Sequence, residues 1–287
     1  MTDDLLNVYS MVSVPGHRAF YPHHHSELEI AYFRSGHGTY SVTGREYPIE
    51  AGDIFMFSNN EIHKITYVDP AVPMEALNIH IHPRLILTEA TALNLPQLFF
   101  DRRPGYSNRL NESNCTGDSS ICDDIRRAMV DIEKEYHSGL PGSELLARQG
   151  LTRVLIYIMR GFDLIDTDTK RYSQSGVSAI TSALEYIDSN YKNDISLTEL
   201  CTRTGMSRSN FERLFTRLAG VSFGEYIKLR RIDCASALLR DSNVTVLEAA
   251  LASGFHNTAN FNKQFKSVTG VTPSEYRLAR REGMASN

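Results

Sequence analysis

The segment Leu247-Glu-Ala-Ala-Leu-Ala-Ser-Gly254 decides the fold of this 287-residue chain, because it is the second copy of a pattern. The first copy, Thr198-Glu-Leu-Cys-Thr-Arg-Thr-Gly205, ends 49 residues earlier. Both copies continue with two phenylalanines and a glycine that stay 50 residues apart: Phe211 and Phe261, Phe215 and Phe265, Gly220 and Gly270. A period this regular is typical of a duplicated supersecondary unit.

Each copy is expected to fold as a helix, a tight turn and a second helix. Ser196 and Thr245 each stand three residues before a glutamate, which is the capping-box pattern that begins a helix. Gly205 and Gly254 end these helices, since glycine adopts the left-handed conformation at little cost. Apolar residues at helical spacing follow in both copies. This is the pattern of a helix-turn-helix, whose second helix can enter a major groove.

Residues 180–281 resemble the AraC/XylS family of bacterial transcription regulators. The resemblance is most specific between Arg231-Ile232 and Ala249-Ala250, and again in Gly254-Phe255 and Gly270-Val-Thr-Pro-Ser-Glu-Tyr-Arg277. One helix-turn-helix pattern is a weak signal, but two in register, joined by a helix and closed by this motif, are a strong one. The resemblance implies a one-component regulator that binds double-stranded DNA, with RNA polymerase and a second copy of the chain as further partners.

The same resemblance assigns the outward residues of the two second helices. Base-reading positions are matched by Ser209, Glu212 and Arg213 in the first unit and by Thr258, Asn260 and Lys263 in the second. Arginine suits guanine and asparagine suits adenine. Phosphate contacts, which set register rather than sequence preference, are expected from Arg208, Arg217, Asn257 and Lys266. The alternative is that these side chains form only the solvated face of an amphipathic helix.

The charge of the chain is divided unevenly. The net charge is −4, yet residues 176–287 hold 14 Lys and Arg against 11 Asp and Glu, while residues 1–175 hold 16 against 23. The division favours an acidic sensing half and a mildly basic nucleic-acid half. We expect a cytoplasmic protein, because there is no apolar run near 18 residues, no export leader and no metal-type pairing of the four cysteines.

The first half of the chain predicts β-structure. A first edge strand is expected around Val8–Val14, and short β-rich runs separated by Gly and Asn turns continue to about residue 81. Many short, evenly spaced strands suggest a cupin-like jelly-roll barrel over residues 8–83. Residues 84–120 look rich in loops.

Two apolar helices are expected over residues 121–160, and they complete a sensor domain of residues 1–162. They either cover the barrel or pair with a second subunit. Their apolar stripes are Ile121, Ile125, Met129 and Ile132, and then Leu145, Leu146, Leu151, Val154, Leu155 and Ile158. A linker at 163–176 precedes an all-helical domain at 177–287, whose first helix is expected over Ser178–Tyr191. The predicted fold class is therefore α+β, with a β-barrel, then helices, then two helix-turn-helix motifs.

Histidines and a glutamate mark a candidate site in the barrel. The spacing His23-x-His25-x3-Glu29-x6-Gly36 resembles the first cupin motif, and Gly52-x5-Ser58-x-Asn60-x2-His63 resembles the second. His23 and His25 alternate to one face of a strand, so their side chains can converge. The equivalents of His23, His25, Glu29 and His63 hold a divalent ion in metal-binding cupins, and such ligands suit Zn, Fe, Ni or Mn.

Three interpretations of this cluster stay open: a small-molecule pocket without metal, for example for a sugar; a metal site; and inert core polarity. We expect a regulator that responds to an effector bound at His23, His25, Glu29 and His63, with no catalysis and no required cofactor. The alternatives are a cupin metalloenzyme fused to a DNA-binding module, or a DNA-binding protein with a degenerate sensor. The effector, the target genes and the sign of regulation are open.

Overall fold

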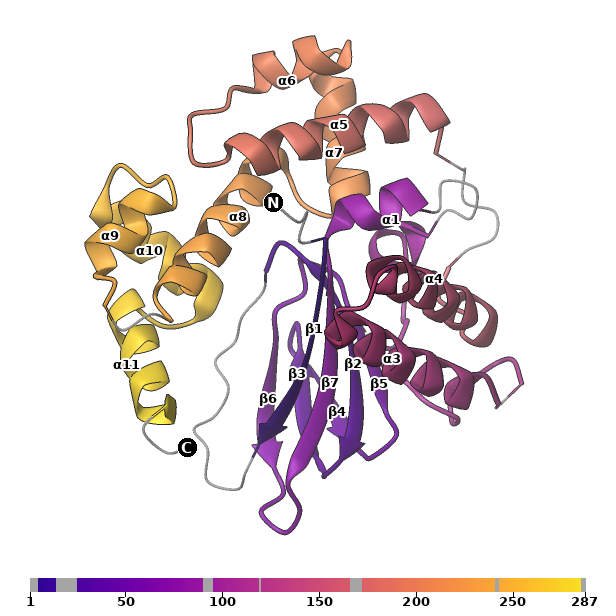
Figure 1. Cartoon of the computed structure of the whole chain (residues 1–287). Helices are drawn as coiled ribbons and strands as arrows, with labels where there is room; N and C mark the ends of the chain where they lie inside the picture. The colour runs from indigo at the N-terminus through magenta and orange to yellow at the C-terminus, as the bar shows by residue number, and fades with distance from the viewer. Residues whose placement is uncertain are drawn as a thin grey trace.

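Two antiparallel sheets form the first part of the chain (Figure 1). The computed structural model describes residues 5–13, 25–89, 95–118, 120–165, 172–240 and 243–284. The larger sheet has the order β1-β7-β2-β5-β8, and the smaller has the order β4-β3-β6. The strands are β1 (Leu6–Ser13), β2 (Leu28–Ser35), β3 (Gly38–Val42), β4 (Arg45–Ile49), β5 (Ile54–Phe57), β6 (His63–Val68), β7 (Met74–Ile81) and β8 (Arg109–Leu110).

The larger sheet is buried on both faces, which explains the nearly continuous apolar sequence of its central strands. Alternate residues of a strand point to opposite faces. On β2, Ala31 and Phe33 pack in the core between the two sheets, whereas Leu28 and Ile30 pack in a second core on the other face. The predicted N-terminal β domain is confirmed, and β6 is a strand that the sequence runs had not marked.

Two long helices supply that second core. They are α3 (Ser120–Ser138) and α4 (Ser143–Gly161), and they lie along the outer face of the larger sheet (Figure 1). Met129 and Leu155 are buried there with residues of β2, β5 and β7. Of the two expected roles for these helices, covering the β domain is therefore confirmed, and the pairing of subunits stays a prediction.

The buried stripe of α4 differs from the predicted one at its start. Leu145 and Leu146 are exposed by 61% and 51%, so these two members of the predicted apolar stripe do not help to cover the β domain. The buried face begins with Ala147 and continues through Gly150, where a side chain would meet Ile132 of α3 at 2.7 Å. Close approach of the two helices at these small residues turns the two leucines outward.

The segment expected to be rich in loops contains two short helices and a short strand. These helices are α1 (Pro83–Glu89) and α2 (Gln97–Phe100). They are too short to produce a periodic sequence signal, and tertiary packing stabilises them instead. In α1, Leu85 and Ile86 pack into the core of the β domain, while Leu87 packs into the core of the C-terminal helices. The two halves of the chain are thus joined by apolar contacts.

The last part of the chain is entirely helical, as predicted. It comprises α5 (Gln174–Asn190), α6 (Leu197–Thr204), α7 (Arg208–Ala219), α8 (Phe223–Leu238), α9 (Val246–Ala252), α10 (Thr258–Thr269) and α11 (Pro273–Met284). The paired phenylalanines Phe211, Phe215, Phe261 and Phe265 are fully buried. Helices α6–α7 and α9–α10 are the two helix-turn-helix units, and α8 joins them (Figure 1).

The helix ends follow the capping signals in the sequence. Thr245 and Glu248 form a complete capping box, and the Ser196 side chain accepts from the Glu199 amide. Helix α5 begins at Gln174, earlier than expected, because Ser173 caps it through the Gly176 amide. Of the expected linker, residues 163–165 pack against the N-terminal half, where Ile165 bridges to Arg102, and 166–171 lie outside the described residues. Among the described residues, no helix is long and apolar enough to cross a membrane.

The glycines at the two equivalent turns differ in their surroundings, which gives a test of the fold. Gly205 and Gly254 both have positive φ angles, of 66° and 93°. A Cβ at Gly205 meets nothing within 4 Å, but one at Gly254 would lie 2.7 Å from the backbone of Lys192. We expect Gly205→Ala to lower the free energy of unfolding by about 1–2 kcal/mol, the cost of the left-handed conformation. Gly254→Ala should cost at least about 1 kcal/mol more by chemical denaturation; equal costs would contradict the packing.

Candidate effector site and DNA-binding helices

A buried carboxylate stands at the centre of the candidate effector site. Oε2 of Glu29, on β2, lies 3.1 Å from Nε2 of His25 and 3.2 Å from Nε2 of His63, the first residue of β6. All three side chains are buried. His25 lies before β2 and outside the strand, so the expectation that strand alternation aligns it is wrong; a bend at Ser26 and Glu27 separates it from β2, and its ring lies against Glu29. His23 lies outside the described residues.

A third histidine completes the cluster, and the sequence analysis missed it. His80 of β7 is the register partner of Glu29, and its Nε2 lies 3.5 Å from Glu29 Oε2. Nδ1 of His80 lies 2.9 Å from Oε2 of Glu27, and the Tyr9 hydroxyl lies 3.0 Å from Nε2. The alternation Asn78-Ile-His80-Ile-His82 predicts polar groups on one face of β7. The sequence does not show that β7 pairs with β2, and this pairing brings His80 to Glu29.

The site is electrostatically polarised. Burial by itself raises the pKa of Glu29, but the charge of His80 and hydrogen bonds from His25 and His63 bring it well below its ordinary value. Glu27 responds in the same way: burial opposes ionisation, yet the hydrogen bond from His80 lowers its pKa to about 2. Although burial lowers the pKa of His80, the Glu29 charge raises it overall. The cluster therefore holds two carboxylates in their charged form.

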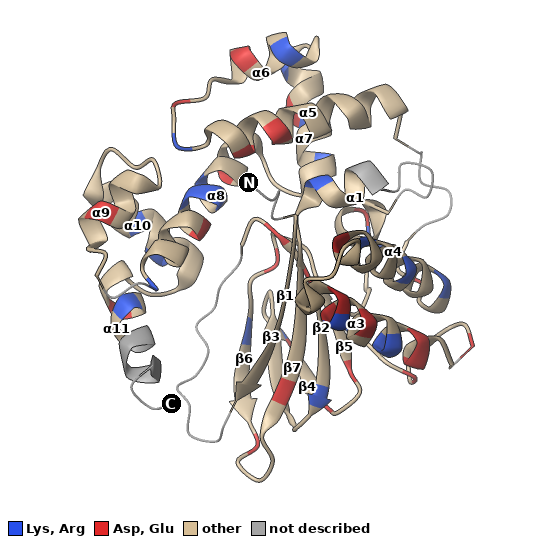
Figure 2. Ribbon diagram, viewed as in Figure 1, with Lys and Arg blue, Asp and Glu red and all other residues tan. Residues whose placement is uncertain are grey.

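The segment that carries the cluster also contacts the DNA-binding half. Ser26, between His25 and Glu27, donates to Oδ2 of Asp233 on α8 through its amide (3.1 Å) and its hydroxyl (2.6 Å). Arg230, one turn earlier on α8, donates to the Ser26 hydroxyl at 3.4 Å. Figure 2 shows that α8 carries both basic and acidic residues.

Further polar contacts join the two halves. Nε2 of His82, just after β7, lies 2.8 Å from the Tyr226 hydroxyl and 3.1 Å from the carboxylate of Asp188. Arg217 of α7 forms an ion pair of 3.1 Å with Asp101. The end of α7 is therefore held against the N-terminal half.

Most of the predicted DNA-contacting residues are exposed. On α7 these are Arg208, Ser209, Glu212 and Arg213, and around the start of α10 they are Asn257, Thr258, Asn260 and Lys263. Arg217 differs, since it is partly buried by its pairing with Asp101. Arg208 and Glu212 lie 3.4 Å apart, and Asn210 accepts from Arg213 at 2.9 Å. The two units thus present equivalent polar faces.

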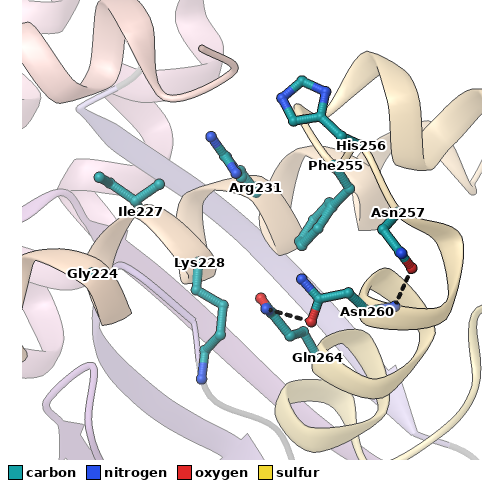
Figure 3. Close-up of a pocket in the computed structure, with 9 residues that line it drawn as sticks. All are labelled: Gly224, Ile227, Lys228, Arg231, Phe255, His256, Asn257, Asn260 and Gln264. Atoms are coloured by element: carbon teal, nitrogen blue, oxygen red, sulfur yellow. Dashed lines mark hydrogen bonds between the residues drawn. The ribbon is translucent and has the colours of Figure 1, made fainter. Parts of the chain in front are cut away.

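A groove separates α8 from the start of α10 (Figure 3). Ile227 and Phe255 form its apolar part, and Lys228 lies on its α8 side. Within its wall, Asn257 caps α10 through the Asn260 amide, and Asn260 in turn accepts from the Gln264 side chain at 3.0 Å. One residue expected to read bases, Asn260, is therefore positioned by hydrogen bonds within its own helix.

Comparisons with known proteins agree with this two-part arrangement. The profile of an AraC-like ligand binding domain matches residues 12–149, and that of a helix-turn-helix domain matches residues 200–279. The HTH-type transcriptional activator AarP of Providencia stuartii is 33% identical over 111 residues, which are 39% of this chain and 82% of AarP. This chain belongs to the AraC family. It is a DNA-binding transcription regulator with an N-terminal ligand-binding domain.

Two further proteins are similar to this chain. The Transposon Tn10 TetD protein of Escherichia coli is 34% identical over 104 residues, which are 36% of this chain and 75% of TetD. A structure of ToxT from Vibrio cholerae has the same fold, with a TM-score of 0.58 and 19% identity over 96% of this chain and 98% of ToxT. Because AarP is a transcriptional activator, the comparisons favour a regulator over the alternative of a metalloenzyme.

Removing the central carboxylate should destabilise this AraC-family protein. Because the Glu29 pKa is lowered, its contribution is present above the ordinary value of 4.5 and is lost as pH falls toward the lower folded value. At pH 7 we expect Glu29→Gln to reduce the free energy of unfolding by about 3 kcal/mol, since it leaves buried imidazoles without their counter-charge. Glu75→Gln, which breaks a pair with Arg34 at a carboxylate that is 39% exposed, should cost at most about 1 kcal/mol. Equal losses in chemical denaturation would contradict this role of Glu29.

Proposed function

We propose that this AraC-family regulator reads DNA sequence through α7 and α10 and that an effector bound at the histidine cluster controls this binding. The observation that carries the proposal is the equivalent exposure of the predicted contact residues in two helix-turn-helix units. In such proteins the second helix of each unit enters a major groove, and successive grooves on one face are roughly 34 Å apart. Ser209, Glu212 and Arg213 are the proposed base readers of the first unit, and Thr258, Asn260 and Lys263 are those of the second.

The proposed effector is a small polar molecule or ion, because its site is small, buried and charged. His25, Glu29, His63 and His80 offer hydrogen bonds that suit sugar hydroxyl groups, and the same atoms can serve as metal ligands. The contacts of Ser26 with α8, the helix that joins the two DNA-binding units, support control of DNA binding by this proposed site. Since AarP is a transcriptional activator, we propose activation through RNA polymerase as the output of the chain in the cytoplasm.

We also propose that the protein forms a homodimer through the outer surface of α3 and α4. Leu140, Leu145 and Leu146 expose more than half of their surface, and Val130 and Tyr136 of α3 are also exposed. Exposed apolar residues gathered on one surface are typical of an interface. Leu155 is unsuited as a probe of this dimer because it is buried in the subunit core.

The DNA-reading proposal is tested with a matched pair on one helix. Binding sites are selected from a random-sequence library with wild-type protein, and affinities are measured on selected and altered sites. Lys263→Ala should reduce affinity for the selected sites by about 1–3 kcal/mol and relax one position of the motif. Lys266→Ala, an expected phosphate contact, should weaken all sequences alike and reduce the salt dependence. Absence of any selected motif would refute sequence-specific binding, and a uniform effect of both changes would refute the assignment of Lys263.

The dimer is tested by sedimentation at micromolar concentration. The double change Leu145→Glu with Leu146→Glu should yield monomers, because charged side chains oppose burial of this surface. Leu247→Glu on α9, at a leucine that is 53% exposed outside the proposed interface, should leave the dimer intact. A monomeric wild-type protein would reject the proposal.

A further inference from the structure

We propose that His25, Glu29, His63 and His80 bind one divalent transition-metal ion, and that this ion holds α8 against the N-terminal half through Ser26. The metal site stands on the geometry of the cluster alone. The effect on DNA rests on the proposed function of the preceding section.

The ring nitrogens of the cluster have defined roles. Nδ1 of His25 lies 2.9 Å from the Glu27 carbonyl oxygen, and Nδ1 of His63 lies 2.9 Å from that of Glu61. A carbonyl oxygen only accepts hydrogen bonds, so both Nδ1 atoms carry hydrogen. The third imidazole, His80, directs Nδ1 to the Glu27 carboxylate in the same way. When the rings are neutral, the three Nε2 atoms carry lone pairs on the side of Glu29, and a cation bound between them would satisfy these atoms and the carboxylate together.

In metal-binding histidines one ring nitrogen binds the metal, and the other usually donates a hydrogen bond to a backbone carbonyl or a carboxylate. The separations also fit. Bonds of about 2.0–2.1 Å in a tetrahedral site place neighbouring ligand atoms about 3.3 Å apart. Glu29 Oε2 lies 3.1 Å and 3.2 Å from Nε2 of His25 and His63, and all three donor atoms lie within 4.8 Å of one another.

His80 is the proposed fourth donor, and it shares a set of donor atoms within 4.8 Å of one another with His25 and Glu27. Its Nε2 is 3.5 Å from Glu29 Oε2 and is also 3.0 Å from the Tyr9 hydroxyl, which can turn toward solvent because Tyr9 is partly exposed. Three imidazoles and one carboxylate select Zn²⁺, Fe²⁺, Ni²⁺ or Mn²⁺ over Ca²⁺ and Mg²⁺, which prefer oxygen ligands.

Ser26 responds to metal binding because the residues on either side of it, His25 and Glu27, belong to the metal site. His25 is a proposed ligand and Glu27 orients His80, so the cation fixes the backbone on both sides of Ser26. Ser26 contacts α8 of the DNA-binding half directly and reaches α7 through Asn59. Its amide and hydroxyl donate to Asp233 on α8, and its carbonyl accepts from Asn59, whose side chain also donates to the carbonyl of Ala219 at the end of α7.

The arrangement held in this way restrains the first helix-turn-helix unit. Arg217, an expected phosphate contact, is paired with Asp101, and Gly220 packs so closely that a Cβ there would lie 2.3 Å from Asn59 and 2.4 Å from Phe100. Metal that stabilises this docking should therefore lower DNA affinity, and loss of metal should free Arg217 for phosphate.

The metal site is tested by titrating Zn²⁺ calorimetrically into the full chain after treatment with a chelator. Wild type should bind one equivalent, and His63→Gln and His80→Gln should each weaken binding at least about tenfold. His37→Gln, at an exposed histidine of the same domain, should bind as wild type does. Circular dichroism checks that the variants fold. If His63→Gln does not fold, the Zn²⁺ affinity of His80→Gln provides the test. The metal site would be overturned if Zn²⁺ did not bind stoichiometrically, or if wild type and the folded cluster variants bound Zn²⁺ equally well. It would also be overturned if the cluster bound a sugar and no Zn²⁺.

The coupling is tested on DNA selected with metal-free protein. Zn²⁺ should weaken wild-type binding at least about fivefold, which is the lower end of allosteric effects. Ser26→Ala and Asp233→Asn should still bind one Zn²⁺ but lose this effect, whereas Asp194→Asn, at an exposed carboxylate, should keep it. Stoichiometric Zn²⁺ binding without a fall in DNA affinity would overturn the coupling alone. A protein that selects no DNA in either state would refute the proposed function and the coupling together, while the Zn²⁺ titration still decides the site.

Discussion

The carboxylate of Glu29 lies buried beside the core between the two sheets, and a charge in such a position must be compensated. Three imidazoles provide that compensation, and they come from different parts of the N-terminal half: the segment before β2, the start of β6 and the end of β7. Their convergence orders the end of the β domain that faces the helices. A stack of His63 on Phe57, with ring centroids 4.4 Å apart, joins the polar cluster to the apolar core.

The position of this cluster gives the two halves of the chain a common boundary. Apolar packing of Leu87 in the C-terminal core joins the halves without regard to any effector. The bonds of Ser26 with Asp233 and Asn59 are different, because they begin in the segment that carries His25 and Glu27. The segment therefore contacts α8 directly and reaches the end of α7 through the Asn59 side chain. At this point the two halves are connected by the hydrogen bonds of one residue, Ser26, and not by a long series of intermediate contacts.

Much of the C-terminal half was predictable because its signals are local. Capping residues, turn glycines and apolar residues at helical spacing act within a few positions of the chain, and they located both helix-turn-helix units. The prediction was weaker where packing decides the outcome. Helices α1 and α2 are too short for periodicity, and Leu145 and Leu146 point outward because close contact at Gly150 determines which side of α4 is buried.

The sequence by itself determined the duplicated DNA-binding unit, most strands of the N-terminal half other than β6 and β8, and three described members of the cluster: His25, Glu29 and His63. These follow from spacing, since neighbours along the chain control helix ends, turns and strand faces. Only the tertiary structure decided that His80 joins them, because pairing of β2 with β7 brings together residues 51 positions apart. It also decided that Ser26 contacts Asp233, which is 207 positions away, since no local rule relates a bend in one domain to a helix in another.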